Sequence, residues 1–506
     1  MSFGNQDIVL IVVSFLLIVS VLAGKASDRI GVPALLMFLV IGMLAGPGGF
    51  GWIQFSDVGF ARYIGTLSLV FILFAGGLVT RFEIIRPVLR PGVLLATVGV
   101  ALTAGLTAVF AVRVLGMPIL QALLLGSVVS ATDAAAVFTV LRSRNAGLAG
   151  RLRPLIEFES GSNDPMAIFL AVGIIHSTAA ATGGPIEFVR FFFQQAMLGG
   201  LFGFIGGRGL VLLHNRVRFW HEGLYPVLTF ASVMLVYAVT SFLEGSGFLA
   251  AYLMGITAGN REFIHRRSVI RFYDGIAWLA QITMFLTLGL LASPSRLLSV
   301  SGAGIAVAFF LMLVARPLSV FASLAGSGFS VREQAMVAWV GLRGASPIVL
   351  SIFPMLAGIH GADYIASVVF FVVIVSVLVQ GTTLAWVARL LGVSSAYVPE
   401  HRPVMEFDES TGLSNNLREL IVPYGSAVAG RAVVDLCLPP DSLIALISRG
   451  GRFIVPNGGT VLEEGDVLFI LASDAEAPFV QRILACRRED GGRCGCVRTD
   501  ERRKDL

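Results

Sequence analysis

Charged side chains are scarce in this chain. Only 14% of its 506 residues are Asp, Glu, Lys or Arg, whereas 56% are hydrophobic. Residues 1–391 therefore lack the polar residues that a soluble domain needs to cover its surface in water. The scarcity of charge excludes a soluble domain for this part and indicates a membrane protein.

Cysteine is equally scarce, and its pattern does not favour a metal centre. All four cysteines come after residue 436, in a part that we expect to face the reducing cytoplasm, where disulfides are rare. Cys494 and Cys496 form a Cys-x-Cys pair, but neither a second pair nor a nearby histidine completes a set of four ligands. We predict no metal site, apart from a site for a transported alkali cation, and no cofactor.

Two further absences narrow the function. No predicted strand is followed by Gly-x-Gly-x-x-Gly, which excludes a nucleotide-binding Rossmann domain. No basic residue precedes the first apolar run, whereas Lys25 and Arg29 follow it. We therefore expect this run to stay in the protein as a membrane helix and not to be a cleaved signal peptide.

Long apolar runs are what the chain has instead. Crossing a bilayer as a helix takes about 20 residues at a rise of about 1.5 Å each. Residues 1–391 contain such runs at about 8–24, 32–46, 64–79, 92–115, 118–141, 155–177, 188–213, 224–243, 246–259, 274–292, 299–325, 331–355 and 362–391. The predicted fold is an α-helical polytopic membrane protein with about 13 transmembrane helices, the eleventh interrupted by Arg316-Pro317.

Basic residues predict the orientation of these helices, because cytoplasmic loops are enriched in Lys and Arg. Alternate loops differ sharply: one set contains most of the basic residues, and the other holds only Arg62, Arg113, Arg190 and Arg296. We expect the N-terminus outside and the C-terminus in the cytoplasm. The net charge of +5 comes mostly from the basic loops, so it reports topology and does not indicate nucleic-acid binding.

The composition changes near the end of the chain. Residues 402–485 contain short alternating runs separated by turn sequences such as Glu464-Gly465-Asp466, which predicts a small cytoplasmic α+β domain. Residues 1–391 would then form the transmembrane domain and 392–401 a linker. The tail, 486–506, mixes charges of both signs and is predicted to be disordered.

The most informative feature is a carboxylate in the middle of an apolar run. Thr132-Asp133 lies within the fifth run, where insertion scales put the cost of a charged side chain at roughly 2.5–3.5 kcal/mol. Small and hydroxyl residues surround it, and they favour a break in the helix. Discontinuous helices that line a cavity are typical of secondary transporters. Tight packing of small residues between helices would explain the neighbours but not Asp133.

The sixth run supplies a set of oxygen ligands. Ser160 and Asp164 are four residues apart and share a helix face, and Asn163 precedes the aspartate. Pro165 has no N–H to donate to the carbonyl of Gly161, which stays free beside Asp164. Burial disfavours the charged carboxylate unless a cation is present. We therefore predict that a proton and a cation compete for Asp164.

The twelfth run contains a buried cation. Arg343 lies among small residues and a proline, which makes the fifth and twelfth runs the two interrupted helices of a fold with inverted repeats. A guanidinium in an apolar interior needs a partner, and Glu159 is the best candidate. We interpret Glu159 and Arg343 as a structural ion pair, since removing one partner costs about 3–5 kcal/mol.

Several motifs together resemble those of sodium/proton exchangers in the monovalent cation:proton antiporter superfamily. The matching segments are Ala131-Thr132-Asp133, Phe158-Glu159-Ser160 with Asn163-Asp164, Gly341-Leu342-Arg343-Gly344 and Ser246–Tyr252. The resemblance implies a homodimer in which a core domain moves against a dimerisation domain. It places the ion at Asp164 with Thr132, Ser160, Asn163 and Asp133, and Asn163-Asp164 implies electroneutral exchange.

Residues 402–485 resemble the C-terminal TrkA-C (RCK_C) regulatory domain of potassium transporters. The matching residues include Gly430-Arg431, Arg449 and Glu464-Gly465-Asp466. Together the two resemblances imply an antiporter, not an enzyme, in a bacterial inner membrane. Potassium is the expected cation, with sodium as the alternative, and a small molecule is the expected ligand of the regulatory domain. A cation channel and an organic-anion symporter are the alternatives of another class.

The Gly199, Gly203 and Gly207 series in the seventh run is typical of closely packed helices. We expect this packing at the dimer interface.

Overall fold

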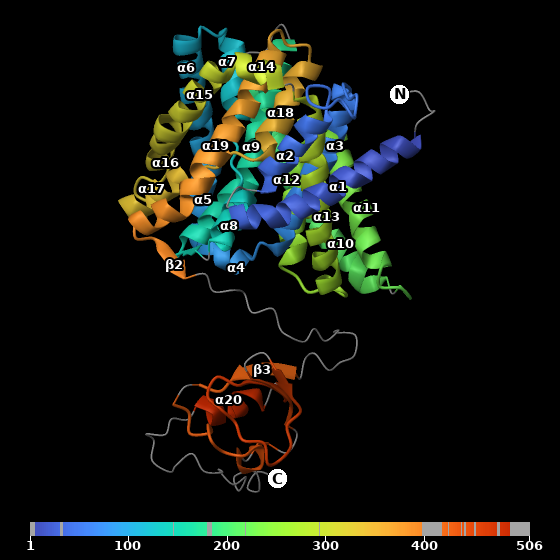
Figure 1. Cartoon of the computed structure of the whole chain (residues 1–506), viewed down its shortest axis with the longest axis vertical. Coiled ribbons are helices and arrows are strands. Elements are labelled where there is room, and N and C mark those ends of the chain that lie inside the picture. The colour runs from blue at the N-terminus through green and yellow to red at the C-terminus, as the bar shows by residue number, and fades with distance from the viewer. Residues whose placement is uncertain are drawn as a thin grey trace. The chain divides into compact units, whose positions relative to one another are not determined.

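The computed structural model divides into two compact units, Met1–Val398 and Pro399–Leu506, which are described separately (Figure 1). The structure describes residues 6–30, 34–144, 146–179, 185–217, 219–292, 294–396, 417–423, 425–436, 438–439, 442–449, 452–472 and 476–485. The four cysteines and the tail 486–506 lie outside these ranges.

The first unit is helical. The helices in the first part of the chain are α1 Gln6–Ile30, α2 Ala34–Ala45, α3 Val58–Val79, α4 Phe82–Ile85, α5 Leu89–Leu94, α6 Val100–Leu115, α7 Ile119–Val128, α8 Ala134–Ser143 and α9 Leu152–Ala179. The remaining helices are α10 Pro185–Arg216, α11 Leu224–Phe242, α12 Gly247–Gly259, α13 Arg266–Leu291, α14 Pro294–Ser299, α15 Ser301–Phe310, α16 Arg316–Ser323, α17 Val331–Trp339, α18 Ala345–Leu356 and α19 Ala362–Leu390.

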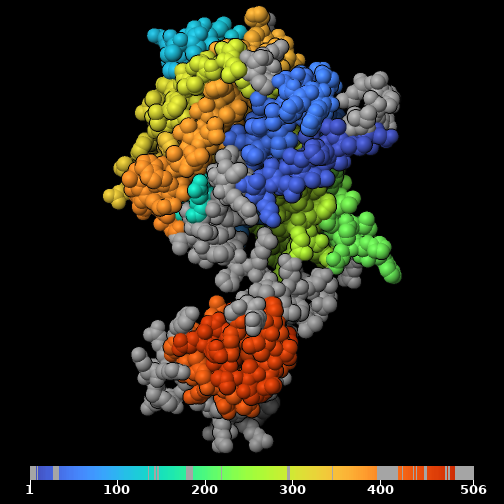
Figure 2. All heavy atoms as spheres, in the orientation of Figure 1, coloured from blue at the N-terminus to red at the C-terminus, as the bar shows by residue number. Residues whose placement is uncertain are grey.

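These helices are those of a polytopic membrane protein. Within the described ranges, seven are long and apolar enough to cross a membrane, by length and composition, and five shorter apolar helices accompany them. Large apolar side chains also face outward, as on α1, which lies on the surface of the unit, where Leu10, Phe15 and Leu22 are exposed (Figure 2). The total of 13 spans stays a prediction.

Helix contacts sort the unit into two groups. The scaffold helices α2, α3, α10, α11, α12 and α13 pack mainly on one another. The core helices, α5 to α9 and α15 to α19, form the second group (Figure 1). Contacts between the groups involve α9 with α10 and α12, and α18 with α3 and α13.

Glycines bring the scaffold helices close together. An added Cβ would lie 2.4 Å from the Phe74 carbonyl oxygen at Gly255 and 2.4 Å from the Leu286 carbonyl oxygen at Gly42. The predicted close packing of Gly199, Gly203 and Gly207 is confirmed, but the partner is not a second subunit. All three face α12 of the same chain, because a missing side chain lets the α10 backbone approach the α12 carbonyls.

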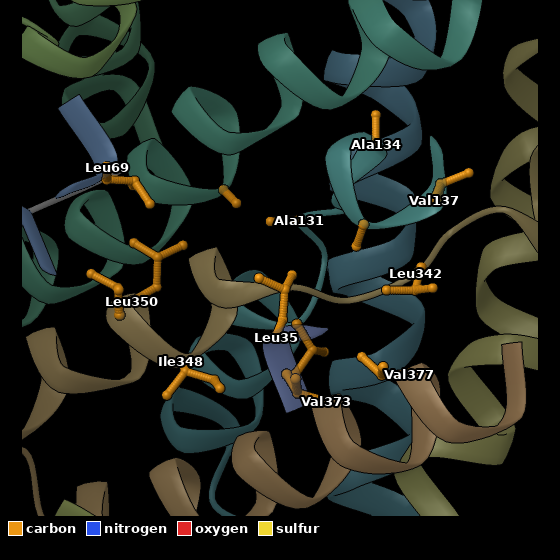
Figure 3. Packing of buried hydrophobic residues seen from close by; sticks show 14 of the residues in the cluster. Leu35, Leu69, Ala131, Ala134, Val137, Leu342, Ile348, Leu350, Val373 and Val377 are labelled. Carbon is orange, nitrogen blue, oxygen red and sulfur yellow. The ribbon is translucent and has the colours of Figure 1, made fainter. Parts of the chain in front are cut away.

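Both predicted helix breaks are present. Residues 129–133 separate α7 from α8, and residues 340–344 separate α17 from α18. In Figure 3, Ala131 and Leu342 lie on these unwound stretches, with Val377 of α19 close to Leu342. The two breaks thus face each other inside the core group.

The predicted interruption at Arg316-Pro317 is not a break. A π-helical turn, η4 Leu311–Ala315, joins α15 to α16, so that Ser301–Ser323 runs as one helix. Pro317 follows this π-helical turn directly, and its missing N–H removes one bond from the ladder without ending the helix. A second π-helical turn, η3 Leu95–Gly99, joins α5 to α6.

A two-stranded ribbon completes the first unit. β1 Ala146–Leu148 follows α8 and pairs antiparallel with β2 Ser394–Ala396, which follows α19. Residues 394–396, which fall within the expected linker, therefore form a strand.

In its described residues, the second unit contains a four-stranded antiparallel sheet in the order β3-β6-β4-β5, together with an α-helix. The strands are β3 Leu417–Ile421, β4 Leu443–Arg449, β5 Arg452–Ile454 and β6 Val467–Leu471, and the helix is α20 Ala477–Ala485. Buried Val422, Ile447, Leu468 and Val480 belong to its apolar core. The predicted α+β character is thus present in the described residues.

Helix packing in the scaffold can be tested with two neighbouring glycines of α10. Alanine at Gly203 would meet the Ala250 carbonyl oxygen at 2.7 Å, whereas nothing lies within 4 Å of a Cβ at Gly200. We expect Gly203→Ala to lower the thermal stability of the detergent-solubilised protein. Gly200→Ala is the control and should be neutral or stabilising, since Ala favours a helix by about 1 kcal/mol over Gly. Equal melting temperatures would contradict the packing argument.

Candidate functional site

The two unwound stretches are tied together crosswise. The backbone N–H of Asp133, in the first break, donates to the carbonyl oxygen of Leu342, in the second, over 2.8 Å. In return Arg343 Nη1 donates to the carbonyl oxygen of Ala131 over 2.8 Å. Backbone groups that lost their helical partners are thereby satisfied, as a buried backbone requires.

The charges at this crossing suit the helix ends beside them. Asp133 Oδ1 accepts the Ala136 N–H at 3.1 Å, so Asp133 caps the N-terminus of α8. Its carboxyl also packs on Gly344, at the start of α18, where an added Cβ would overlap it. Negative charge near two helix N-termini is favourable, because the helix dipole is positive there. Asp133 therefore contacts the N-termini of both α8 and α18. Its side chain is partly exposed.

The polar residues of α9 connect to the first break. Ser160 Oγ donates to the Thr132 carbonyl oxygen over 2.9 Å and accepts the Ala134 N–H at 2.8 Å. Asn163 Nδ2 donates to Thr132 Oγ1. Thr132, Ser160 and Asn163, all named from the sequence, thus lie together and are buried.

Two buried oxygen atoms at this place lack a protein partner. Asp164 Oδ2 accepts a hydrogen bond from Ser346 Oγ at 2.7 Å, but Asp164 Oδ1 and Asn163 Oδ1 have no hydrogen-bond partner among the described residues. Buried polar atoms are normally paired, so an exception calls for an explanation. Carboxylate and amide oxygens are hard ligands suited to an alkali cation, and the carboxylate also takes up a proton.

The sequence predicted that Glu159 pairs with Arg343, and this partner is wrong. Glu159 Oε2 accepts from Arg316 Nη2 at 2.8 Å, and both side chains are only 2% exposed. Arg316 reaches across because Gly341 leaves room, with its Nε 3.0 Å from the position of a Cβ there. Arg343 instead donates to the backbone at Ala131.

Sequence reasoning missed two residues of this site. Arg316 was treated only as a helix interruption, although a charge in the middle of an apolar run indicates a buried partner. Ser346 lies two residues after Gly344, among the small residues that follow Arg343. Its hydroxyl is a donor close to the second break, which is the signal that points to a carboxylate partner.

A crevice lies between the scaffold helices and the core. Its volume is about 230 Å³, and its lining comes from α2, α3, α8 and α13. Asp274 of α13 is the one ionisable residue among the lining residues, which are mostly apolar. Ala136 of α8 also lines it, and the Ala136 N–H is the one that Asp133 accepts. The crevice thus reaches the helix turn that begins at the first break.

The fold of the first unit is that of a solved antiporter. A solved structure of the sodium proton antiporter MjNhaP1 from Methanocaldococcus jannaschii at pH 8 matches with a TM-score of 0.67 at 23% identity. The match covers 76% of this chain and all of that one.

Residues 13–390 match the family described as sodium/hydrogen exchanger, transmembrane. That span is most of the chain. The chain belongs to the sodium/hydrogen exchanger family.

Named relatives agree with this membership. The K(+)/H(+) antiporter NhaP of Alkalimonas amylolytica is 38% identical over 95% of this exchanger and 83% of its own length. The K(+)/H(+) antiporter NhaP2 of Shewanella sp. strain ANA-3 is 40% identical over 92% of this exchanger and 81% of its own length. The exchanger is a transporter and not an enzyme, as the sequence motifs predicted.

Residues 417–485 of the exchanger match the TrkA-C domain, which confirms the second resemblance. Two of the residues that carried it, Arg449 and Asp466, hold the fold together. Arg449 Nε and Nη2 each donate to Asp466 over 2.8 Å, forming a two-pronged pair between β4 and the turn before β6. These motif residues are therefore structural.

The buried pair yields a test of the corrected assignment. Glu159→Ala and Arg316→Ala should each lower stability by about 3–5 kcal/mol, because each leaves a buried charge unpaired. The double variant should cost less than the sum of the two, and the shortfall should exceed that of Glu159→Ala combined with Arg343→Ala. Detergent melting curves of the five variants measure this. A larger coupling with Arg343 would contradict the assignment.

Proposed function

We propose that this exchanger carries potassium in exchange for protons and that Asp164 binds the two in turn. The observation that carries the proposal is that two buried oxygens, Asp164 Oδ1 and Asn163 Oδ1, have no hydrogen-bond partner within the described part of the chain. Such atoms are expected where a ligand that is not part of the chain completes their coordination. Thr132, Ser160 and Asp133 fix the surroundings of the ion through the contacts described above.

The choice of cation is supported by the relatives. Those with about 40% identity over most of this chain are named K(+)/H(+) antiporters, whereas the 26% identical protein of Methanocaldococcus jannaschii is named a Na(+)/H(+) antiporter. Sodium is therefore the second candidate. The sites of both would use the same hard oxygen ligands.

A single carboxylate is enough for exchange. Asp164 either holds a proton or, as the carboxylate, holds one monovalent cation, and both loaded forms carry the same charge. The other buried charges, Glu159, Arg316 and Arg343, do not change in this scheme. The scheme makes exchange electroneutral, with one proton per cation.

Alternating access is supported by the arrangement of the helix groups. We propose that the core helices move against the scaffold helices, carrying the two breaks with them. The inverted-repeat architecture is supported by two matched features: each half has a π-helical turn (η3 and η4), followed by a broken helix (α7–α8 and α17–α18). Thirteen spans are part of this architecture.

We propose further that the crevice is the access route from the cytoplasm. Its lining comes from the scaffold helices α2, α3 and α13 and, on the core side, from Ala136, whose N–H donates to Asp133. Asp274 would attract cations into it, since a carboxylate in an apolar-walled cleft focuses the electric field. The cytoplasmic assignment rests on the basic loops, which put the C-terminus of α3 and the N-terminus of α13 on that side.

The proposal includes the setting of the exchanger. It would lie in a bacterial inner membrane as a homodimer, with its N-terminus outside and its C-terminus in the cytoplasm. Residues 1–391 would carry out exchange, 392–401 would serve as linker and 402–485 as a regulatory domain that binds a small molecule. Residues 486–506 would form the polar tail.

The central test is Asp164→Asn in proteoliposomes. This variant cannot exchange a proton for a cation, so we expect no cation-driven proton flux although the protein inserts and melts normally. A matched control is Asp57→Asn, which changes a carboxylate that caps α3 outside the site. Wild-type flux in Asp164→Asn would remove Asp164 from the mechanism.

The substrate is tested in the same vesicles with a pH-sensitive dye. Gradients of potassium, sodium or an organic anion are applied in turn, with and without an ionophore that clamps the voltage. We expect potassium, and more weakly sodium, to drive proton flux without moving charge. Flux driven only by organic anions would favour a symporter, and current without proton exchange would favour a channel.

The access route predicts a one-sided effect of Asp274→Asn. Removing this carboxylate should raise the cation concentration for half-maximal flux several-fold at low salt when the cation is on the cytoplasmic side. The effect should shrink at high ionic strength, because salt screens exposed charges. Glu187→Gln, another exposed carboxylate, should change neither value. An equal effect from both sides of the membrane would contradict the route.

A further inference from the structure

The β1–β2 ribbon joins two distant parts of the chain. Ala146, Gly147 and Leu148 pair with Ala396, Ser395 and Ser394 in antiparallel register. The Ala149 N–H continues the ladder by donating to the Val393 carbonyl oxygen over 3.0 Å. A short segment that leads away from α19 is thus attached to the loop between α8 and α9.

That loop connects the two sides of the ion site. α8 begins directly after Thr132 and Asp133, and α9 carries Glu159 to Asp164. Movement of the loop therefore acts on the break and on the proposed transport carboxylate together.

One end of the ribbon is anchored and the other is open. Leu148 and Val393 are buried at the anchored end. Close by, Arg151 Nη2 donates to the Gly328 carbonyl oxygen over 3.1 Å, and its guanidinium lies 4.6 Å from the centre of the Phe329 ring. The terminal pair, Ala146 and Ala396, marks the open end, where the chain continues toward the TrkA-C domain.

Such a ribbon can open at small cost. An isolated pair of strands is only marginally stable, and these strands have three residues each. A pull or a new contact on the chain after Ala396 reaches the terminal pair first, so that the pairs can separate one after another toward the anchored end.

We propose that the β1–β2 ribbon is a latch through which the TrkA-C domain regulates the ion site. The closed latch restrains the loop between α8 and α9, and the open latch frees it. The domain regulates exchange if its own states favour the closed and open latch differently. This inference rests on the proposed function, since it assigns a regulator to the proposed ion site.

A reversible cross-link tests the latch. Hydrogen-bonded and non-hydrogen-bonded pairs alternate in an antiparallel ladder, so the bond at Ala149 makes Ala146 and Ala396 a non-hydrogen-bonded pair. The Cα atoms of such pairs lie about 4.5 Å apart, within the range of a disulfide. Ala146→Cys with Ala396→Cys, in a chain whose native cysteines are serine, should lock the latch closed on oxidation.

The readout is the dependence of proton flux on pH and cation concentration. We compare the full chain with a chain that ends after Ala396, which keeps the ribbon and lacks the domain. In the reduced state the half-maximal cation concentration of the two should differ by about fivefold or more, as is typical of allosteric coupling. After oxidation the two chains should give the same curve, and reduction should restore the difference.

A second variant holds the latch open. Ser395→Pro removes a backbone N–H from β2, which a ladder does not tolerate. In the full chain its curve should match that of a chain ending after Gly392, which lacks β2. Ser395→Ala keeps the N–H and should behave like the parent chain.

Three results would overturn the latch. They are an unchanged fivefold difference after oxidation, the absence of any difference in the reduced state, and a wild-type curve for Ser395→Pro. If Ser395→Pro does not insert, the comparison of oxidised and reduced protein still decides, because it uses one set of folded molecules. Failure of the proposed function looks different, since cation-driven proton flux would then be missing in the reduced parent.

Discussion

The crossing of two unwound stretches is the constraint on which the site depends. Breaking a helix inside a membrane leaves backbone groups without partners, and no water is available to replace them. Here each break satisfies the other, through the Asp133 N–H on Leu342 and through Arg343 on the Ala131 carbonyl oxygen. With these bonds made, α8 and α18 begin where a capping carboxylate can meet both.

Buried charge is balanced around this crossing. Glu159 and Arg316 neutralise each other, and Arg343 donates a hydrogen bond to a backbone oxygen. Asp164 is left as the carboxylate whose second oxygen has no partner in the described structure. In the proposed mechanism this is what makes it exchangeable: the other charges are held by the protein, and only Asp164 has to be completed by a proton or a cation.

Some of this could be predicted from the sequence, for reasons that the residues make plain. The breaks were predictable because Asp133 and Arg343 each stand among small residues in an apolar run, a combination that an intact membrane helix does not explain. The grouping of Ser160, Asn163 and Asp164 followed from helical spacing.

The partner of Glu159 could not be predicted in this way, because an ion pair between two helices depends on which helices are neighbours in the fold. The sequence predicted Arg343 as that partner and did not consider Arg316, whose side chain fits beside Glu159 because Gly341 leaves room for it. The same limit explains the α10 glycines, whose spacing predicts a close neighbour but not which helix it is.

The contacts within and between the helix groups differ in kind, and that difference bears on movement. In the scaffold, Gly255 meets the Phe74 carbonyl oxygen and Gly42 that of Leu286, so backbone lies against backbone and neither helix can slide without a clash. At the boundary, Gly65 meets the Val349 side chain and Gly161 the Tyr252 ring, which are side chains that can change rotamer. Movement of the core as a rigid body requires that the contacts at its boundary can adjust while the contacts within each group stay fixed. Side-chain contacts at the boundary and backbone contacts within the scaffold meet this requirement. The ribbon at Ala146 and Ala396 contacts the core helices α8 and α19, so a regulator attached there would act on the group that we propose to move.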